Sequence, residues 1–283
     1  MAKKPNPHNK KRSGKPDHHR KGPGKGKPKR TGSARVRENS EEEGMRLNKY
    51  VAHCGVCSRR QAADHVKNGL VTVNREVVKE PFYQVQPGDI VAFKDEVIRP
   101  EIRKVYFLMN KPKNTITTVS DDRGRRTVMD IIKSRVKERV FPVGRLDRAT
   151  TGLLLLTNDG DLAQKMMHPS YVIKKIYHVH LDKPVDPEHI KAIREGITLD
   201  DGPVPVDEVN YLEDKPGNQD VGITLHIGRN RIVRRTFEHF GYQVEKLDRV
   251  YLGGLTKKDL PRGFVRPLKR QEIIMLKHFT GKK

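Results

Sequence analysis

A mainly apolar segment in the middle of the chain, residues 141–160, organises the hydrophobic pattern. It reads FPVGRLDRATTGLLLLTNDG. The four consecutive leucines from Leu153 to Leu156 are bounded by turn residues, which is typical of a short buried strand. A turn from Gly144 to Asp147 places one acidic side chain where the chain enters the interior. Because a buried carboxylate needs a compensating partner, we expect either a cation beside Asp147 or a turn at the surface.

The pattern of residues 45–102 predicts a small domain in which two helices precede several short strands. Apolar residues keep helical spacing from Leu47 to Cys54. Ser58 and Gln61 then have the spacing of a capping box, so a second helix is expected to begin after Ser58. Short strands are expected at residues 70–73, 77–78 and 90–93.

Residues 103–283 alternate between strand and helix patterns and predict a second, larger domain. Strands are expected at residues 105–109, 153–156, 176–181, 223–227 and 250–252, helices at 128–132, 162–167, 187–195 and 231–240, and a last apolar segment at 273–276. The order lacks a strict βαβ rhythm, which favours an α+β fold over a doubly wound sheet. The chain has no G-x-G-x-x-G and no P-loop, so we expect no nucleotide cofactor.

Charge indicates the class of partner. The 283 residues carry a formal net charge of +23. Residues 1–44 hold 14 Lys and Arg against 5 Asp and Glu, which leaves 44 and 30 for the rest of the chain. Both parts are basic, so a polyanion such as RNA is the expected partner. The first 44 residues have almost no core-forming side chains and predict a disordered tail, which is either a solubilising or an RNA-binding arm.

Membrane association is not expected, because no apolar stretch is long enough to span a bilayer and no long amphipathic helix with an aromatic face is visible. No signal peptide is visible either, and we expect a cytoplasmic protein. Cys54 and Cys57 form a single C-x-x-C, which we interpret as two small helix residues rather than as a redox pair or half a zinc site. His178 and His180 share a strand face, but without a visible third ligand a metal is not expected.

The cation that Asp147 requires is expected from residues 229–235, which read RNRIVRR. On a helix, residues three and four apart share a face, so some guanidinium among Arg231, Arg234 and Arg235 must point toward the sheet. An arginine beside a buried carboxylate favours the ionised form of that acid.

Two resemblances refine these expectations. Residues 45–95, with the segment LNKYVAHCGVCSRRQAADHVKNGLVTVNREVV, resemble the S-four RNA-binding domain named after a protein of the small ribosomal subunit. That resemblance implies RNA contacts by Arg59, Arg60 and Lys67.

Residues 45–275 resemble the pseudouridine synthases of the RsuA and RluB type, most closely the RluB group. The resemblance is carried by G-R-L-D with T-T-G-L-L-L-L-T-N-D-G at residues 144–160, by KKIY at 174–177, by GRNRIVRR at 228–235, by NKP at 110–112 and by DLPRG at 259–263. It implies a pseudouridine synthase fold, which is a mixed and mainly antiparallel sheet with flanking helices. It also implies a cofactor-free isomerisation of uridine to pseudouridine. Ile232 departs from the pattern, since many relatives have glutamine there.

The same resemblance implies a role for individual residues. Asp147 is the expected catalytic aspartate, Tyr177 the ring that lies against the flipped base, and Arg234 the ion partner of Asp147. Arg145 is expected to help hold the extruded nucleotide or to fill its place. Further RNA or substrate contacts are expected from Arg148, Lys111, Arg231 and Arg235. On its alternating strand alone, a tyrosine such as Tyr177 is more often a core residue than a catalytic one.

The resulting hypothesis is a monomeric rRNA pseudouridine synthase with a target in large-subunit rRNA, either free or in an assembling subunit. The alternatives are a small-subunit rRNA target and a non-catalytic RNA-binding or ribosome-assembly protein on the same fold. Loss of the central acid would favour the non-catalytic alternative, but Asp147 is present. A DNA-binding protein is disfavoured, because no helix-turn-helix or zinc-finger spacing occurs.

Overall fold

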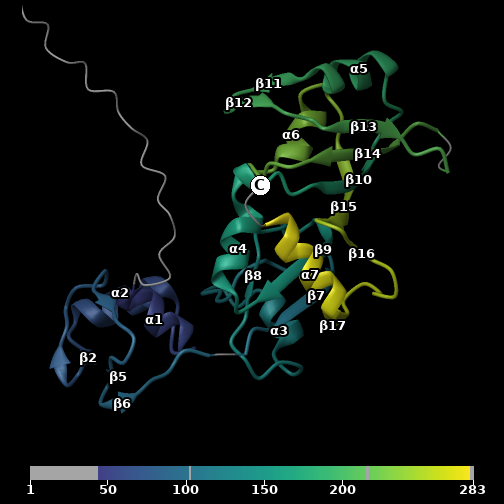
Figure 1. Ribbon diagram of the computed structural model, residues 1–283. Coiled ribbons are helices and arrows are strands. Elements are labelled where there is room, and N and C mark those ends of the chain that lie inside the picture. The colour runs from purple at the N-terminus through teal and green to yellow at the C-terminus, as the bar shows by residue number, and fades with distance from the viewer. Residues whose placement is uncertain (1–43, 102, 215–216, 281–283) are drawn as a thin grey trace, which may run out of the picture. The chain divides into compact units, whose positions relative to one another are not determined.

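The computed structural model describes residues 44–101, 103–214 and 217–280 (Figure 1). The chain divides into residues 1–42 and residues 43–283, and the described residues all belong to the second unit. The predicted basic tail, apart from Gly44, lies outside the described residues. None of the described helices combines the length and apolar character that crossing a membrane would require.

The N-terminal domain has the two predicted helices followed by short strands, but a short strand that was not predicted, β1, precedes the first helix. Its elements are α1 (Leu47–His53), α2 (Arg59–Lys67), β1 (Met45–Arg46), β2 (Val71–Val73), β3 (Glu76–Val77), β4 (Gln84–Val85), β5 (Val91–Phe93) and β6 (Glu96–Val97). Four of the strands form a sheet in the order β3-β2-β5-β6. The Ser58 hydroxyl accepts a hydrogen bond from the Gln61 backbone N–H, and the reciprocal bond completes the predicted capping box.

The larger domain is built on a nine-stranded sheet in which most neighbouring strands are antiparallel. Seven of the strands follow the order β13-β14-β10-β15-β9-β7-β17, and β8 and β16 pair with β9 and β15. The strands are β7 (Tyr106–Lys111), β8 (Phe141–Pro142), β9 (Thr151–Thr157), β10 (Lys175–Leu181), β13 (Glu208–Tyr211), β14 (Asp220–Leu225), β15 (Val244–Leu252), β16 (Leu255–Thr256) and β17 (Val265–Pro267). This arrangement confirms the predicted α+β class and the mainly antiparallel sheet.

Helices and a separate hairpin complete the larger domain. They are α3 (Val128–Ile132), α4 (Gly160–Met167), the 3-10 turn η1 (Pro169–Tyr171), α5 (Pro187–Glu195), α6 (Ile232–Glu238), α7 (Arg270–Phe279) and the hairpin strands β11 (Ile197–Leu199) and β12 (Gly202–Val204). In Figure 1, α5 and α6 accompany the half of the sheet that contains β10 and β14, whereas α3, α4 and α7 accompany the half that contains β7 and β9.

The strand β9 is buried on both faces, as the leucine run predicts. Leu153 and Leu155 belong to a core shared with α4 and α7, whereas Leu154 and Leu156 belong to a second core shared with α3. All four leucines have no exposed surface. Coverage from both sides explains why this strand is a continuous apolar run rather than an alternating one.

The two halves of the sheet meet where β15 pairs with β9 in parallel. Only two residue pairs are in register there, Asp248 with Thr151 and Arg249 with Gly152. Gly152 has a φ of +108°, and a Cβ at this position would lie 2.3 Å from the Arg249 carbonyl oxygen. The close approach of the two backbones therefore requires glycine. We refer to these two pairs as the seam of the sheet.

Several element boundaries differ from the expectation. The helix predicted at residues 231–240 spans only Ile232–Glu238, because Arg231 adopts a left-handed conformation with a φ of 45°. The strand predicted at residues 250–252 is the end of the nine-residue β15. The hairpin of β11 and β12, and the strands β13 and β17, were not predicted from the sequence.

Candidate active site

The loop that carries Asp147 is held at several points. The Gly144 backbone N–H donates to the Met167 sulfur at 3.1 Å. The Thr117 hydroxyl donates to the Leu146 carbonyl oxygen at 2.8 Å. The Thr150 N–H donates to the Asp147 carbonyl oxygen at 3.0 Å, closing the turn. The loop therefore presents Asp147 from a fixed backbone rather than from a free surface turn.

Lys111, at the end of β7, supports this loop from inside. Its side chain is fully buried. Its ammonium donates to the carbonyl oxygens of Thr150 at 2.8 Å, Pro112 at 3.1 Å and Arg148 at 3.5 Å. Burial lowers the pKa of Lys111 to about 8, although the charge of Asp147 opposes this effect. The predicted RNA contact by Lys111 is at odds with this burial, because the ammonium is turned to the protein backbone.

Asp147 opens onto a cavity of about 440 Å³ between the two halves of the sheet. Tyr177 from β10 lines the same cavity. Its ring is half-buried. It packs against two hydrophobic cores, one that includes β10 and α6 and one that includes α3 and β9. The remaining lining residues come mainly from the loop at 143–150, from α4, from residues 227–233 and from β15. A cavity of this size, with apolar walls and a few polar groups, suits a small planar ligand.

Arg234 is the buried guanidinium that the helix pattern predicts. It is 7% exposed, and its Nη1 donates to the Val244 carbonyl oxygen at 2.7 Å. Burial and the nearby Arg231 lower its pKa, while the charge of Asp147 opposes the shift. Within the described residues, Nε and Nη2 of Arg234 have no hydrogen-bond partner, and no ion pair joins them to Asp147. The structure thus brings the two residues into electrostatic range without direct contact.

Arg231, immediately before α6, and Arg235, within it, differ in their surroundings. Arg231 is exposed at the rim of the cavity and pairs with Glu238 at 2.9 Å. Arg235 forms ion pairs with Asp200 and Asp201, which raise its pKa. These pairs tie α6 to the turn between β11 and β12. Arg235 does not line the cavity, so a structural role accounts for its position.

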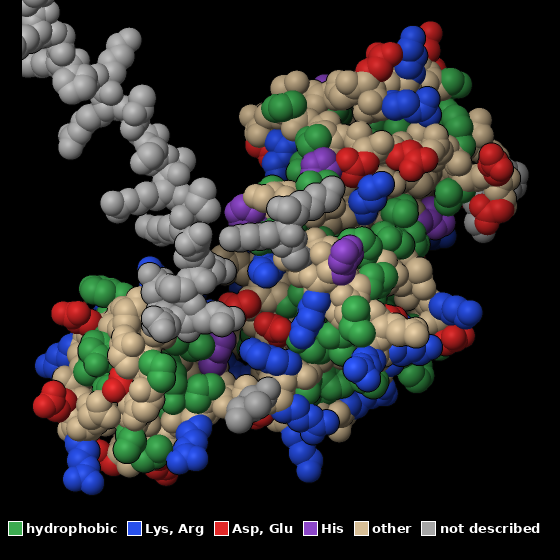
Figure 2. Space-filling model, in the orientation of Figure 1, with side chains coloured by type: hydrophobic (Ala, Val, Ile, Leu, Met, Phe, Trp, Pro, Cys, Tyr) green, Lys and Arg blue, Asp and Glu red, His purple; other side chains and the backbone are tan. Residues whose placement is uncertain are grey.

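The remaining basic residues of the expected RNA contacts are exposed: Arg145 and Arg148 on the loop, and Arg59, Arg60 and Lys67 on α2. Arg145 lines the cavity beside Asp147. Ile232, which replaces the usual glutamine, also lines the cavity and is buried. Figure 2 shows Lys and Arg side chains scattered among Asp and Glu over the visible face rather than gathered in a single patch.

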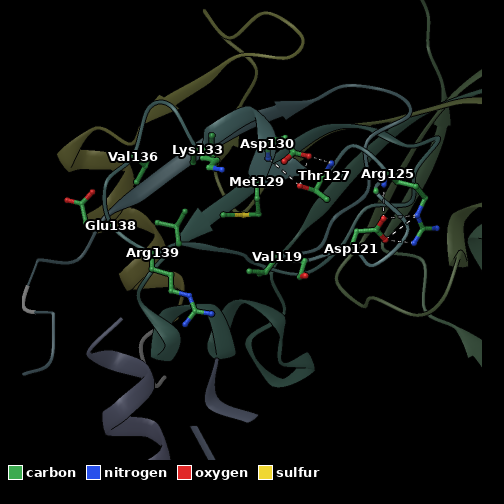
Figure 3. Close-up of a pocket in the computed structure, with 14 residues that line it drawn as sticks. Val119, Asp121, Arg125, Thr127, Met129, Asp130, Lys133, Val136, Glu138 and Arg139 are labelled. Carbon is green, nitrogen blue, oxygen red and sulfur yellow. Dashed lines mark hydrogen bonds and ion pairs between the residues drawn. The ribbon is translucent and has the colours of Figure 1, made fainter. Parts of the chain in front are cut away.

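A second cavity, of about 540 Å³, lies beside α3 and residues 119–127 (Figure 3). Two of its acids are already paired: Asp121 binds Arg125, and Asp130 caps α3 through Thr127. The cavity includes neither Asp147 nor Tyr177. Because both acids have partners within the chain, we do not assign the chemistry to this cavity.

No group of three or more metal-ligating side chains occurs among the residues that the structure describes. Cys57 is buried and Cys54 is partly so, and both are free thiols. Burial raises the pKa of Cys54 to about 12, so this thiol is not a ready nucleophile. His178 and His180 share a strand face, as predicted, and both bind Asp220.

The sequence reasoning did not assign two cations of the cavity, the half-buried Lys175 and the buried Arg249. The Lys175 ammonium donates to the carbonyl oxygens of Ile173 and His226. Burial, and then repulsion by Arg249, lower the pKa of Lys175 to about 8. Arg249 is only 3% exposed. The segment 244–252 carries four charged residues, so its pattern gave no signal that distinguishes Arg249.

Comparison with known proteins gives a consistent family. The model of the RNA pseudouridylate synthase family matches residues 105–239, and that of the S4 domain matches residues 45–91. Ribosomal large subunit pseudouridine synthase B of Bacillus subtilis is 39% identical, over 82% of this chain and 95% of that protein. The dual-specificity RNA pseudouridine synthase RluF of Escherichia coli is 35% identical, over 83% and 79%. A crystal structure of a pseudouridylate synthase, 30% identical, superposes with a TM-score of 0.60 and covers 82% of this chain and 100% of that one.

Proposed function

Because the chain belongs to the RNA pseudouridylate synthase family, we propose that it isomerises a specific uridine of large-subunit rRNA, with Asp147 as the catalytic residue. The observation that carries the proposal is the position of Asp147. It is the one acidic side chain among the described residues that line the cavity, and Tyr177 and several cations surround the same space. The identity of the RNA rests on similarity to relatives of the large-subunit type.

The isomerisation needs a carboxylate in contact with the nucleotide. The uracil must leave the C1′ carbon of the ribose through N1, turn over, and rejoin through C5. Asp147 begins this sequence either by attacking the nucleotide or by removing a ribose proton. Its loop is held by Lys111 and Thr117, so the carboxylate is positioned before the substrate arrives, which removes an entropic cost from the reaction.

Tyr177 and Arg234 serve the bound nucleotide in different ways. The half-buried ring of Tyr177 offers a flat surface against which the uracil stacks. Arg234 has two nitrogen atoms, Nε and Nη2, without partners in the described residues. It lies close enough to Asp147 to respond to its charge. We assign it the role of stabilising that carboxylate when the nucleotide excludes water from the cavity.

A uridine inside folded RNA must first leave its stack, which costs a few kcal/mol (roughly,). Phosphate contacts by exposed basic residues offset this cost. The S-four domain presents Arg59 and Arg60 at the start of α2, where both side chains are exposed. Arg145, at the mouth of the cavity, is placed to occupy the space that the extruded nucleotide leaves.

The test is pseudouridine mapping of rRNA from cells that lack this protein, with the wild type or Asp147→Asn restored. We expect one site to disappear from large-subunit rRNA and only the wild type to restore it. Purified Asp147→Asn should still bind that RNA. Wild-type turnover by Asp147→Asn would overturn the assignment of the catalytic residue. A lost site in small-subunit rRNA would instead correct the substrate.

A further inference from the structure

Arg249 is a buried guanidinium whose hydrogen bonding is incomplete. Its side chain comes from β15 and is 3% exposed. Nε donates to the Leu153 carbonyl oxygen of β9 at 2.7 Å. Nη2 has no acceptor among the described residues. A buried charged donor without an acceptor is costly, so an unused N–H in this position calls for an explanation.

The sheet register places Arg249 at the centre of the candidate active site. Arg249 is directly opposite Tyr177 on β10 and opposite Gly152 on β9. Side chains of directly paired residues lie on the same face of a sheet, and Arg249 and Tyr177 both line the cavity onto which Asp147 opens. The bond from Nε to the Leu153 carbonyl oxygen ties the guanidinium to β9. Its own strand, β15, lies between β9 and β10, and β10 carries Tyr177.

The other cations of this region, of which Lys175 is half-buried, have different surroundings. Lys175 donates to two carbonyl oxygens and Lys111 to three. Arg234 is within electrostatic range of Asp147. Arg249 has a buried N–H without an acceptor among the described residues, and it is the cross-strand partner of Tyr177. The lining as a whole is cationic, because it contains five Lys and Arg residues and one acid: Arg145, Lys175, Arg229, Arg231, Arg249 and Asp147.

We propose that Arg249 is a further catalytic residue, whose guanidinium donates to a carbonyl oxygen of the uracil ring and stabilises negative charge on the departing base. The inference rests on the proposed function. When the C1′–N1 bond breaks, its electron pair remains on the uracil and is shared with O2 and O4. The C1′–C5 bond then forms, C5 loses a proton and N1 gains one. Arg249 stays protonated throughout and transfers no proton.

The charge on the base is present in the transition state and absent from the bound uridine. A fixed donor that meets such charge accelerates the reaction more than it strengthens binding. The buried position favours this role over phosphate binding, since phosphate contacts in nucleic-acid complexes come largely from groups at the surface. The uracil would therefore lie between the ring of Tyr177 and the guanidinium of Arg249.

The test compares Arg249→Gln and Arg249→Lys with wild type in single-turnover reactions at saturating enzyme on the rRNA fragment identified by mapping. Arg194→Gln is a control at an exposed position outside the site. It removes an arginine that also donates to a strand carbonyl oxygen, that of Val209 at 3.0 Å, and Arg194 is outside the cavity. Thermal unfolding of each variant reports whether the seam of the sheet is intact.

We expect Arg249→Gln to slow the single-turnover rate by about 10²- to 10³-fold, as for other lost donors to developing charge, with unchanged RNA affinity. Arg249→Lys should recover part of the rate, and Arg194→Gln should match wild type. A near-wild-type rate in Arg249→Gln would overturn the inference while leaving the proposed function intact. A wild-type enzyme that forms no pseudouridine in any rRNA would overturn both.

A second readout separates charge stabilisation from a structural defect. Fluorine at C5 of the target uridine stabilises negative charge on the base and so reduces the need for Arg249. Because C5 carries fluorine in place of a proton, the rejoined base adds water across its N1–C6 bond instead of losing a proton, and this hydrated 5-fluoro C-nucleoside is followed by chromatography of the digested nucleosides. We expect the ratio of wild-type to Arg249→Gln rates to be smaller on this RNA than on normal RNA. An equal ratio on both RNAs would show that Arg249 serves only the fold. A loss of rate in Arg249→Gln that is accounted for by the fraction of unfolded protein would show the same.

Discussion

Replacing Lys111 by methionine should separate the activity of the protein from its stability. Methionine fills a similar volume but removes the ammonium that holds the loop of Asp147. Two acceptors of this ammonium are backbone oxygens of the loop just after Asp147, at Arg148 and Thr150, and the third is the carbonyl oxygen of Pro112, next to Lys111 itself. Without their common donor the loop loses its support from inside, and a displacement of about 1 Å at a reacting group costs roughly 10²-fold in rate.

The stability terms nearly cancel. The pKa of Lys111 is about 8 against an ordinary 10.5, so its burial in the charged form costs about 3 kcal/mol at neutral pH. Methionine removes this cost. It also leaves the buried oxygen of Thr150, and to a lesser degree those of Pro112 and Arg148, without this donor, at about 1–3 kcal/mol for each unsatisfied group. We expect the free energy of unfolding to change by less than about 2 kcal/mol.

The pH dependence of stability has a definite sign. Above pH 8 the folded protein releases the Lys111 proton, whereas the unfolded chain keeps it until about pH 10.5. Stability rises with pH where the unfolded state binds more protons. Wild type should therefore gain stability relative to Lys111→Met between pH 8 and 10.5. Urea unfolding at several pH values, with single-turnover assays at pH 7.5, measures both effects. A loss of several kcal/mol at neutral pH, or an unchanged rate, would refute this reasoning.

Two further predictions concern the seam of the sheet. Gly152→Ala should destabilise the protein by about 3 kcal/mol or more, because the new Cβ would meet the Arg249 backbone at 2.3 Å and φ is +108°; an unchanged melting temperature would contradict this. Asp248 accepts hydrogen bonds from Lys257 and Thr151, and although burial alone would raise its pKa, these partners and Arg262 hold it below the ordinary 3.8. Asp248→Asn should therefore cost about 2 kcal/mol at pH 7. The difference from wild type should begin to shrink near pH 4, where the carboxylate of the unfolded chain takes up a proton, and should shrink further as pH falls through the lower pKa of the folded carboxylate; a pH-independent difference in urea titrations would exclude an ionic contribution.

The sequence was most informative where local chemistry and burial agree. The four leucines of β9 form a continuous apolar run, and such a run predicts a strand that is covered on both faces. Helices do cover both faces of β9. Ser58 and Gln61 form their capping box within one turn of helix. For Asp147 the local pattern left open a partnered acid or a surface turn, and the catalytic assignment came from the resemblance carried by G-R-L-D at residues 144–147. In the first two cases the feature that matters is within a few residues of the pattern that predicts it.

The sequence was least informative where distant strands meet. Arg249 reaches the site through its register with Tyr177 and Gly152, and both pairings join residues more than seventy positions apart. Lys111 has a basic side chain like any RNA-binding lysine, and only its burial shows that it supports a loop. Arg231 keeps the helical spacing of its neighbours, yet its left-handed backbone starts α6 one residue later. These features depend on tertiary contacts that no local pattern encodes.

The seam also bears on how the protein holds its substrate. Its parallel pairing joins only two residue pairs, whereas β7 and β9 align over six and β10 and β15 over seven. The cavity lies across this junction, with Asp147 contributed by one half of the sheet and Tyr177 by the other. A nucleotide bound there would bridge both halves, and a ligand that binds only the folded state stabilises it. The bound uridine would thus stabilise the contact between the two halves of the sheet, and this stabilisation would end when the product leaves.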